Sequence, residues 1–169
     1  MSNAEVYIGL GGNLGDPAKT FDAAASKLAS GNFEVLKRSS LYRTKPYGYA
    51  EQPDFLNAVI EVCTPLGPRE VLEALQQVEQ TLGKKVVCLN GPRLIDLDLL
   101  YHGDTQIANE VISLPHPEIA RRDFVLLPLA EIAPNFMDPA SGRTIQEMVD
   151  ALEKRHFTGE ILPWPAIGQ

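Results

Sequence analysis

The chain has 169 residues, 44% hydrophobic and 22% charged, which is typical of a soluble globular protein that needs no disulfides to build a core. Its formal charge of −7 argues against nonspecific binding to nucleic acid or to an anionic membrane. Cys63 and Cys88 lack metal or disulfide spacing, and no segment resembles a membrane span or a secretion signal. We therefore expect a single domain over residues 1–169, monomeric and cytoplasmic.

Periodic apolar residues predict six elements in the first two thirds of the chain. In order they are a strand over 6–11, a helix over 17–31, strands over 33–43 and 55–64, a helix over 68–83 and a strand over 91–101. Asp16-Pro17 supplies an N-cap and a first-turn proline for the first helix, and Gly67-Pro68 opens the second. The pattern is then less regular until a helix that we expect from about Thr144.

This βαββαβ order predicts a ferredoxin-like fold of the mixed α/β (α+β) class, with two helices on one face of an antiparallel sheet and a C-terminal extension. Apolar strand faces would contact the helices. The uncovered face would carry glycines, an aromatic ring, an amide and two acids: Gly9, Gly11, Phe55, Asn57, Asp96 and Asp98. Because glycine lets a ligand approach the backbone closely, this set indicates a binding site.

The last predicted strand carries two acids on an otherwise apolar segment. Asp96 and Asp98 point to one side, since side chains alternate along a strand, and Leu97 points to the other. So apolar a strand is expected to be central in its sheet. One or two divalent cations would relieve the repulsion between the carboxylates, and oxygen ligands suit Mg²⁺. The alternative is an edge strand with a solvated polar face. Arg93 joins the acids only if a local irregularity turns it.

Six short motifs follow one another in an order that is far more specific than any of them alone. They are Gly11–Asp16, Tyr42–Thr44, Gln52–Asn57, Gly91–Asp98, Pro115–Pro117 and Arg122–Phe124. With these motifs the chain, from about residue 6 to residue 134, resembles the 6-hydroxymethyl-7,8-dihydropterin pyrophosphokinase family of folate biosynthesis. The resemblance implies transfer of the β,γ-diphosphate of ATP to the hydroxymethyl group of the pterin, with release of AMP.

The resemblance also implies a role for individual residues. The pterin would stack between Phe55 and Phe124, with Asn57, Thr44 and the backbone around Tyr47 at its edge. Asp96 and Asp98 would hold two Mg²⁺ ions, and these acids with Arg93 and Arg122 would form the catalytic set. The residues expected along ATP are Gln76, Glu79, Lys84, Arg93, Leu99, Ser113, His116 and Arg122.

Two features depart from the family pattern. Gly12 stands where many relatives carry serine, and the loop over 84–90 lacks the arginines and tryptophan often found before Gly-Pro-Arg. Only Lys84 and Lys85 keep positive charge there, and lysine does not reproduce the bidentate fork of arginine. We expect this loop to be mobile and to close over bound nucleotide.

Two other classes of function remain open. A non-catalytic ferredoxin-like domain could keep the pocket for ligand binding or regulation without the chemistry. An RNA-binding sheet is the third possibility, and the negative charge and the acids on the open face disfavour it.

Overall fold

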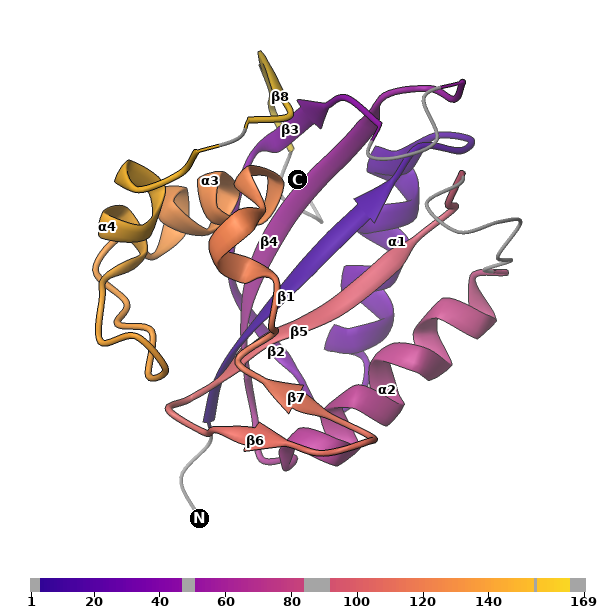
Figure 1. The fold of residues 1–169 in the computed structure, drawn as a ribbon. Coiled ribbons are helices and arrows are strands. Elements are labelled where there is room, and N and C mark those ends of the chain that lie inside the picture. The colour runs from indigo at the N-terminus through magenta and orange to yellow at the C-terminus, as the bar shows by residue number, and fades with distance from the viewer. Residues whose placement is uncertain (1–3, 47–50, 84–91, 154, 165–169) are drawn as a thin grey trace.

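The structure is a computed structural model that describes residues 4–46, 51–83, 92–153 and 155–164. Figure 1 shows a twisted sheet with α1 and α2 on one side and α3 and α4 on the other. The elements are β1 (Ala4–Gly12), α1 (Pro17–Ala29), β2 (Glu34–Arg38), β3 (Leu41–Thr44), β4 (Phe55–Thr64), α2 (Pro68–Thr81), β5 (Asp96–His102), β6 (Ile107–Ala108), β7 (Ser113–Leu114), the 3₁₀ turn η1 (Ile119–Arg121), α3 (Asp123–Ile132), α4 (Ile145–Asp150) and β8 (Phe157–Leu162).

The sheet confirms the ferredoxin-like prediction. Its strand order is β5-β1-β4-β3-β8, with β2 also paired to β4, and all these pairings are antiparallel. The strand expected over 33–43 is two strands, because Ser39 interrupts it. The Ser39 N–H donates to the Val59 carbonyl at 2.9 Å, and the Ser39 hydroxyl accepts from the Val59 N–H at 2.9 Å. The Ser39 hydroxyl thus accepts the hydrogen bond that a backbone carbonyl would accept in a regular strand pair.

The prediction that the acid-bearing strand is central is wrong. Among the described residues β5 is the terminal strand of the sheet and pairs with β1 alone. It is apolar because both of its faces are covered. Leu97 and Leu99 lie in the core beneath α1 and α2, whereas Leu100 and Tyr101 belong to a second core on the other side. A register shift opposite Tyr7 and Ile8 accommodates Leu100 and turns the strand end toward that second core.

The first core confirms the predicted apolar faces. Its strand side chains come from alternate positions of β1 and β4, and its helix side chains from α1 and α2. The N-cap prediction also holds, since the Asp16 carboxylate accepts from the Lys19 N–H at 3.3 Å. Because these side chains point to α1 and α2, the alternate side chains of β1, β4 and β5 point to the other side of the sheet.

That other face is only half open, contrary to the expectation of an uncovered face. α3 and α4 pack over the first part of β1 and the middle of β4, burying Tyr7 and Val59 against Leu126, Leu129 and Ile145. The helix expected from about Thr144 is confirmed as α4, and Thr144 begins it with a capping box. The uncovered remainder lies beside the ends of β1, β4 and β5 where the predicted site residues lie.

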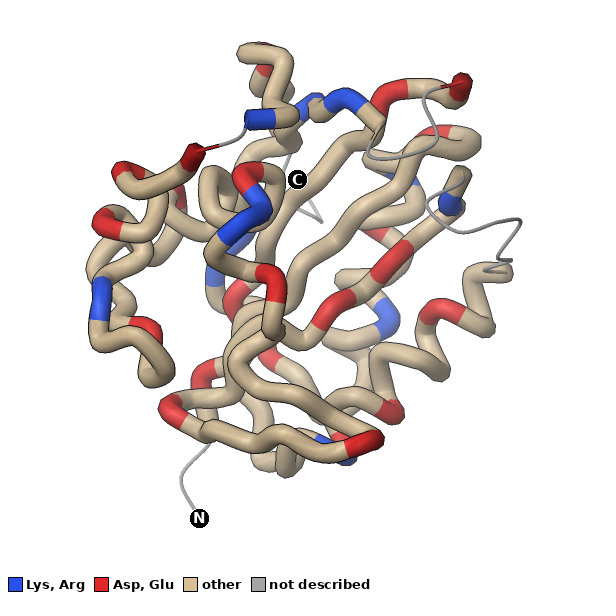
Figure 2. Tube along the Cα trace, in the orientation of Figure 1, with Lys and Arg blue, Asp and Glu red and all other residues tan. Residues whose placement is uncertain are grey.

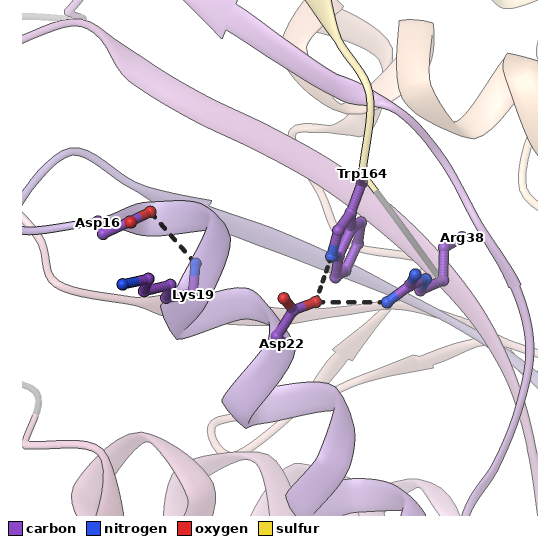
Figure 3. A network of polar contacts seen from close by, with 5 residues as sticks. All are labelled: Asp16, Lys19, Asp22, Arg38 and Trp164. Atoms are coloured by element: carbon purple, nitrogen blue, oxygen red, sulfur yellow. Dashed lines mark hydrogen bonds and ion pairs between the residues drawn. The ribbon is translucent and has the colours of Figure 1, made fainter. Parts of the chain in front are cut away.

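The C-terminal segment crosses from one side of the sheet to the other. After β8, Trp164 packs edge-on against Phe21 of α1, with ring centroids 5.9 Å apart. Figure 3 shows its indole N–H donating to Asp22, at 2.6 Å, while the Arg38 guanidinium pairs with the same carboxylate at 3.4 Å. Burial lowers the pKa of Arg38, and Asp22 opposes that shift. None of the helices within the described ranges is both long and apolar enough to cross a bilayer.

Candidate active site

A cavity of about 610 Å³ occupies the half-open face, within the size range of small-molecule sites. It brings together residues from β1, β3, β4, β5, the η1–α3 segment and the residue before β8. Its wall comprises Gly9, Leu10, Gly11, Thr44, Lys45, Phe55, Asn57, Ala58, Arg93, Asp96, Asp98, Glu118, Arg121, Arg122, Phe124, Val125 and His156. Every member of the set predicted for the open face therefore lies in one cavity.

The two acids stand beside glycines. Asp98 is opposite Gly9 and Asp96 is opposite Gly11 in the β1–β5 ladder, so no side chain of β1 fills the space beside the carboxylates. Figure 2 shows the acidic positions on β5 and basic positions in the segment just before α3. The Arg93 Nε lies 3.3 Å from the Asp96 carboxylate. β5 begins only at Asp96, so the preceding loop supplies the irregularity that turns Arg93 to this side.

These donors fit a divalent cation. Among the described residues no cluster of three or more His, Cys, Asp or Glu side chains forms a closed metal site. Two carboxylates on an open wall suit Mg²⁺, which usually takes one or two protein carboxylates and completes its shell with water and substrate phosphates. Asp96 and Asp98 are the residues that would hold it, with the glycine-lined space beside them for the other ligands.

The other end of the cavity carries an amide and two aromatic rings. The Asn57 amide donates to the Thr44 hydroxyl at 2.7 Å, which leaves that hydroxyl proton available to a ligand. A Cβ at Gly11 would lie 3.0 Å from the Asn57 amide oxygen, so glycine gives this oxygen its room. Phe55 and Phe124 line the same cavity from β4 and α3. This end suits a flat heterocycle with donors and acceptors on its edge.

Cations line the side of the cavity formed by η1 and α3. The Arg122 guanidinium lies 5.5 Å from the centre of the Phe124 ring, and exposed Arg121 pairs with Glu118 at 3.8 Å. His116 is near this wall. Burial lowers its pKa, Asp98 opposes that shift and Arg122 reinforces it. Its Nδ1 accepts from the Glu118 N–H at 3.3 Å, which leaves Nε2 as the ring's other polar atom.

Several residues expected along ATP do not line the cavity. Leu99 is 5% exposed and its side chain packs in the first core, so contact of this residue with the nucleotide stays a prediction. Glu79 is buried and its carboxylate accepts from the Leu97 N–H at 2.8 Å, a contact to β5 rather than to the cavity. Gln76 and Ser113 are exposed outside it. Tyr47, Lys84 and the loop over 84–90 lie outside the described residues.

Asn13 is a residue to which sequence analysis gave no role. It is 5% exposed, its amide donates to the Gln52 side chain and to the Pro53 carbonyl at 2.9 Å each, and its side-chain oxygen accepts from the Arg93 N–H at 2.8 Å. One side chain thus joins the loop that precedes Phe55 to the loop that carries Arg93. The sequence feature that could have pointed to Asn13 is its place in the Gly11–Asp16 motif.

Comparison with known proteins decides the family. Residues 7–134 match the model of the 7,8-dihydro-6-hydroxymethylpterin-pyrophosphokinase (HPPK) family. The chain belongs to this family. All of the site residues predicted from the sequence, Thr44 through Phe124, fall inside the matched segment.

Relatives and solved structures agree with the HPPK match. The chain is 40% identical over 147 residues to the 2-amino-4-hydroxy-6-hydroxymethyldihydropteridine pyrophosphokinase of Synechocystis, covering 86% of this chain and 75% of that protein. It is 38% identical to the folic acid synthesis protein fol1 of Pneumocystis carinii, over 97% of this chain but only 22% of that one. The fold is shared with Plasmodium falciparum HPPK-DHPS, at TM-score 0.70 and 15% identity over 88% of this chain and 43% of that one.

The segment that matches the HPPK model ends at residue 134, but the cavity wall includes a residue later in the chain. His156 and β8 follow residue 134, yet His156 lines the cavity and β8 extends the sheet beside β3. The sequence over 157–162 carries no motif and therefore predicts no role for this segment.

We expect Asn13→Ala to lower both stability and activity. The change leaves the Arg93 N–H and the Pro53 carbonyl without their partner, at a cost of about 1–3 kcal/mol each when such groups stay buried. A thermal melt and steady-state kinetics measure the two effects. Asn13→Asp is the matched control, because it keeps the acceptor for Arg93 but loses the donor for Pro53. Unchanged kinetics in both variants would show that Asn13 does not order the site.

Proposed function

We propose that this protein transfers the β,γ-diphosphate of ATP to the hydroxymethyl group of 6-hydroxymethyl-7,8-dihydropterin, with release of AMP. The observation that carries the proposal is one cavity that unites a carboxylate pair, arginines, and an amide with two aromatic rings. The family membership supports the same activity.

The residues have complementary tasks. Phosphoryl transfer asks a protein mainly for positioning and for neutralisation of charge. Asp96 and Asp98 would hold two Mg²⁺ ions, which supply charge neutralisation at the phosphates when bound. Arg93 and Arg122, which both line the cavity, would add charge-assisted hydrogen bonds from their guanidinium groups. The nucleophile is the substrate's own hydroxyl, so no dedicated nucleophilic side chain is required.

The aromatic end would bind the pterin. Asn57 keeps a carbonyl oxygen and Thr44 keeps a hydroxyl proton for the edge of the ring, and Phe55 and Phe124 offer its stacking faces. We assign His116 and Arg122 to the nucleotide phosphates. The backbone near Tyr47 and the ammonium of Lys84 remain proposals of the same kind, as do contacts of Gln76, Glu79, Leu99 and Ser113 with ATP.

The direct test is product analysis. Protein, ATP, Mg²⁺ and the hydroxymethyl pterin are incubated together, and nucleotide products are separated by chromatography. We expect AMP, and we expect its formation to require both Mg²⁺ and the pterin. A non-catalytic binding domain would bind both ligands without turnover, and ADP as sole product would mean a different phosphoryl transfer.

Phe55→Ala and Phe124→Ala are expected to weaken pterin binding by about 1–3 kcal/mol each, the scale of a base stacked on an aromatic side chain. ATP binding should change much less, because stacking on these rings serves the heterocycle rather than the phosphates. Phe55→Ala is the cleaner of the two tests, since Phe124→Ala also removes the ring that lies 5.5 Å from the Arg122 guanidinium. Calorimetry with each ligand separates the two effects. Equal losses for pterin and ATP would contradict the assignment of these rings to the pterin.

The remaining features of the proposal concern the whole molecule. We propose a cytoplasmic, monomeric, single-domain enzyme with ATP and the pterin as its ligands, and with neither nucleic acid nor membrane as a partner. The negative charge supports the expectation of no nucleic-acid or membrane partner, and the cysteine spacing supports the cytoplasmic location. Gel filtration with light scattering measures the oligomeric state.

A further inference from the structure

The residue before β8 forms part of the cavity wall although it lies outside the family match. His156 lines the cavity, and the Lys45 N–H donates to the His156 carbonyl at 2.9 Å. One residue on, Phe157 is opposite Thr44 in the β3–β8 ladder, and its ring lies 5.5 Å from that of Tyr42. The end of the cavity that carries Thr44 is therefore bounded by a segment that only the C-terminal strand supplies.

Asp123 fixes this segment from the other side. It is fully buried, it is the first residue of α3, and it stands between two residues that line the cavity, Arg122 and Phe124. One of its carboxylate oxygens, Oδ2, accepts from the backbone N–H of His156 at 2.6 Å and from that of Phe157 at 2.8 Å. Asp123 itself is absent from the cavity wall.

The backbone of His156 is consequently held at both of its polar groups. Its N–H reaches Asp123 on α3, and its carbonyl reaches Lys45 next to β3. Both supports carry residues assigned to the heterocycle, Phe124 on one and Thr44 on the other. A carboxylate is also favourable where it stands, because the N-terminus of a helix attracts negative charge.

We propose that Asp123 is a positioning residue for the heterocyclic substrate, because it holds His156 and the start of β8 in place as a wall of the cavity. The inference rests on the proposed function and deepens it, since it names a part of the substrate site outside the family match. The competing explanation is that Asp123 only stabilises the fold and has no influence on the substrate.

A pair of variants separates these explanations. Asp123→Ala removes both hydrogen bonds to β8. Asp123→Asn keeps an oxygen that accepts them, and its new N–H₂ can take the place of Oδ1, which has no hydrogen-bond donor among the described residues. Trp164→Phe is the control, since it loosens the same C-terminal segment at its far end, by loss of the bond to Asp22, without touching the cavity.

We expect Asp123→Ala to raise the KM and the calorimetric Kd for the hydroxymethyl pterin by about tenfold, a difference of ~1.4 kcal/mol, with kcat and the KM for ATP changed less than about threefold. Asp123→Asn should restore the pterin values to within about threefold of the wild type. Trp164→Phe should lower the melting temperature and leave the pterin constants unchanged.

Three results would overturn the proposal. The first is Asp123→Ala with a lowered melting temperature and unchanged pterin constants, and the second is an equal effect of Trp164→Phe on pterin. The third result applies if Asp123→Ala does not fold. His156→Ala is then measured instead, and an unchanged pterin Kd in that variant would overturn the proposal. Absence of AMP from the wild-type protein would refute the proposed function instead, and the calorimetric comparison would still decide the role of Asp123.

Discussion

Asp98→Ala is expected to reduce turnover by several orders of magnitude, and Asp96→Ala to do the same. Each change removes a carboxylate from the cavity wall beside Gly9 and Gly11, where the proposed function places the cations that bind the phosphates. Without these ligands the charge on the triphosphate is no longer neutralised during transfer. Initial rates of AMP formation at saturating ATP and pterin measure the loss.

The same variants should keep the fold. Removal of one carboxylate relieves repulsion within the pair, and loss of the Asp96–Arg93 contact costs only about 0–1 kcal/mol because both side chains are partly exposed. Thermal melts in the absence of Mg²⁺ are the control for activity. A large fall in melting temperature for either variant would favour a structural role for these acids.

Arg93→Ala is expected to lower kcat by about 100-fold to 1,000-fold, the usual effect of removing one fixed donor from the site where charge develops. Arg93 is well placed for this, since its backbone is hydrogen-bonded to Asn13 at both polar groups, and its guanidinium reaches the acid wall. Arg93→Lys should recover only part of the rate, because a point charge does not replace a bidentate fork.

A complementary measurement tests whether Arg93 acts on the chemistry. The Kd for the pterin should be unchanged in Arg93→Ala, because the aromatic end of the cavity is built by β3, β4 and α3. A full recovery of kcat by Arg93→Lys would show that only the sign of the charge matters at this position. A loss of pterin binding would show instead that Arg93 orders the whole cavity.

Local periodicity predicted much of this fold. The alternating faces of β1 and β4, the cap of α1, the start of a helix near Thr144 and the βαββαβ order all depend on short-range patterns, and the structure confirms them. The edge position of β5 was missed because a strand has an apolar sequence whenever both of its faces are buried, whether it lies in the middle of the sheet or at its edge. The second core that buries Leu100 and Tyr101 depends on residues more than 15 positions later in the chain.

Part of the site could also be predicted from local patterns. Alternation alone brought Asp96 and Asp98 to one side, and the sheet then placed them with Phe55 and Asn57. The same alternation places the side chain of Leu99 in the first core. The roles of Asn13 and Asp123 come from side-chain hydrogen bonds to distant loops, and no local pattern reports such bonds.

The most direct measurement follows the phosphorus atoms of ATP. ATP labelled in its β-phosphate is incubated with the wild-type protein, Mg²⁺ and the hydroxymethyl pterin, and the products are separated and counted. The account predicts that the β label appears in a pterin diphosphate, in a one-to-one ratio with AMP, and that Asp98→Ala abolishes its appearance. Recovery of the β label in ADP, with only the γ-phosphate on the pterin, would contradict it.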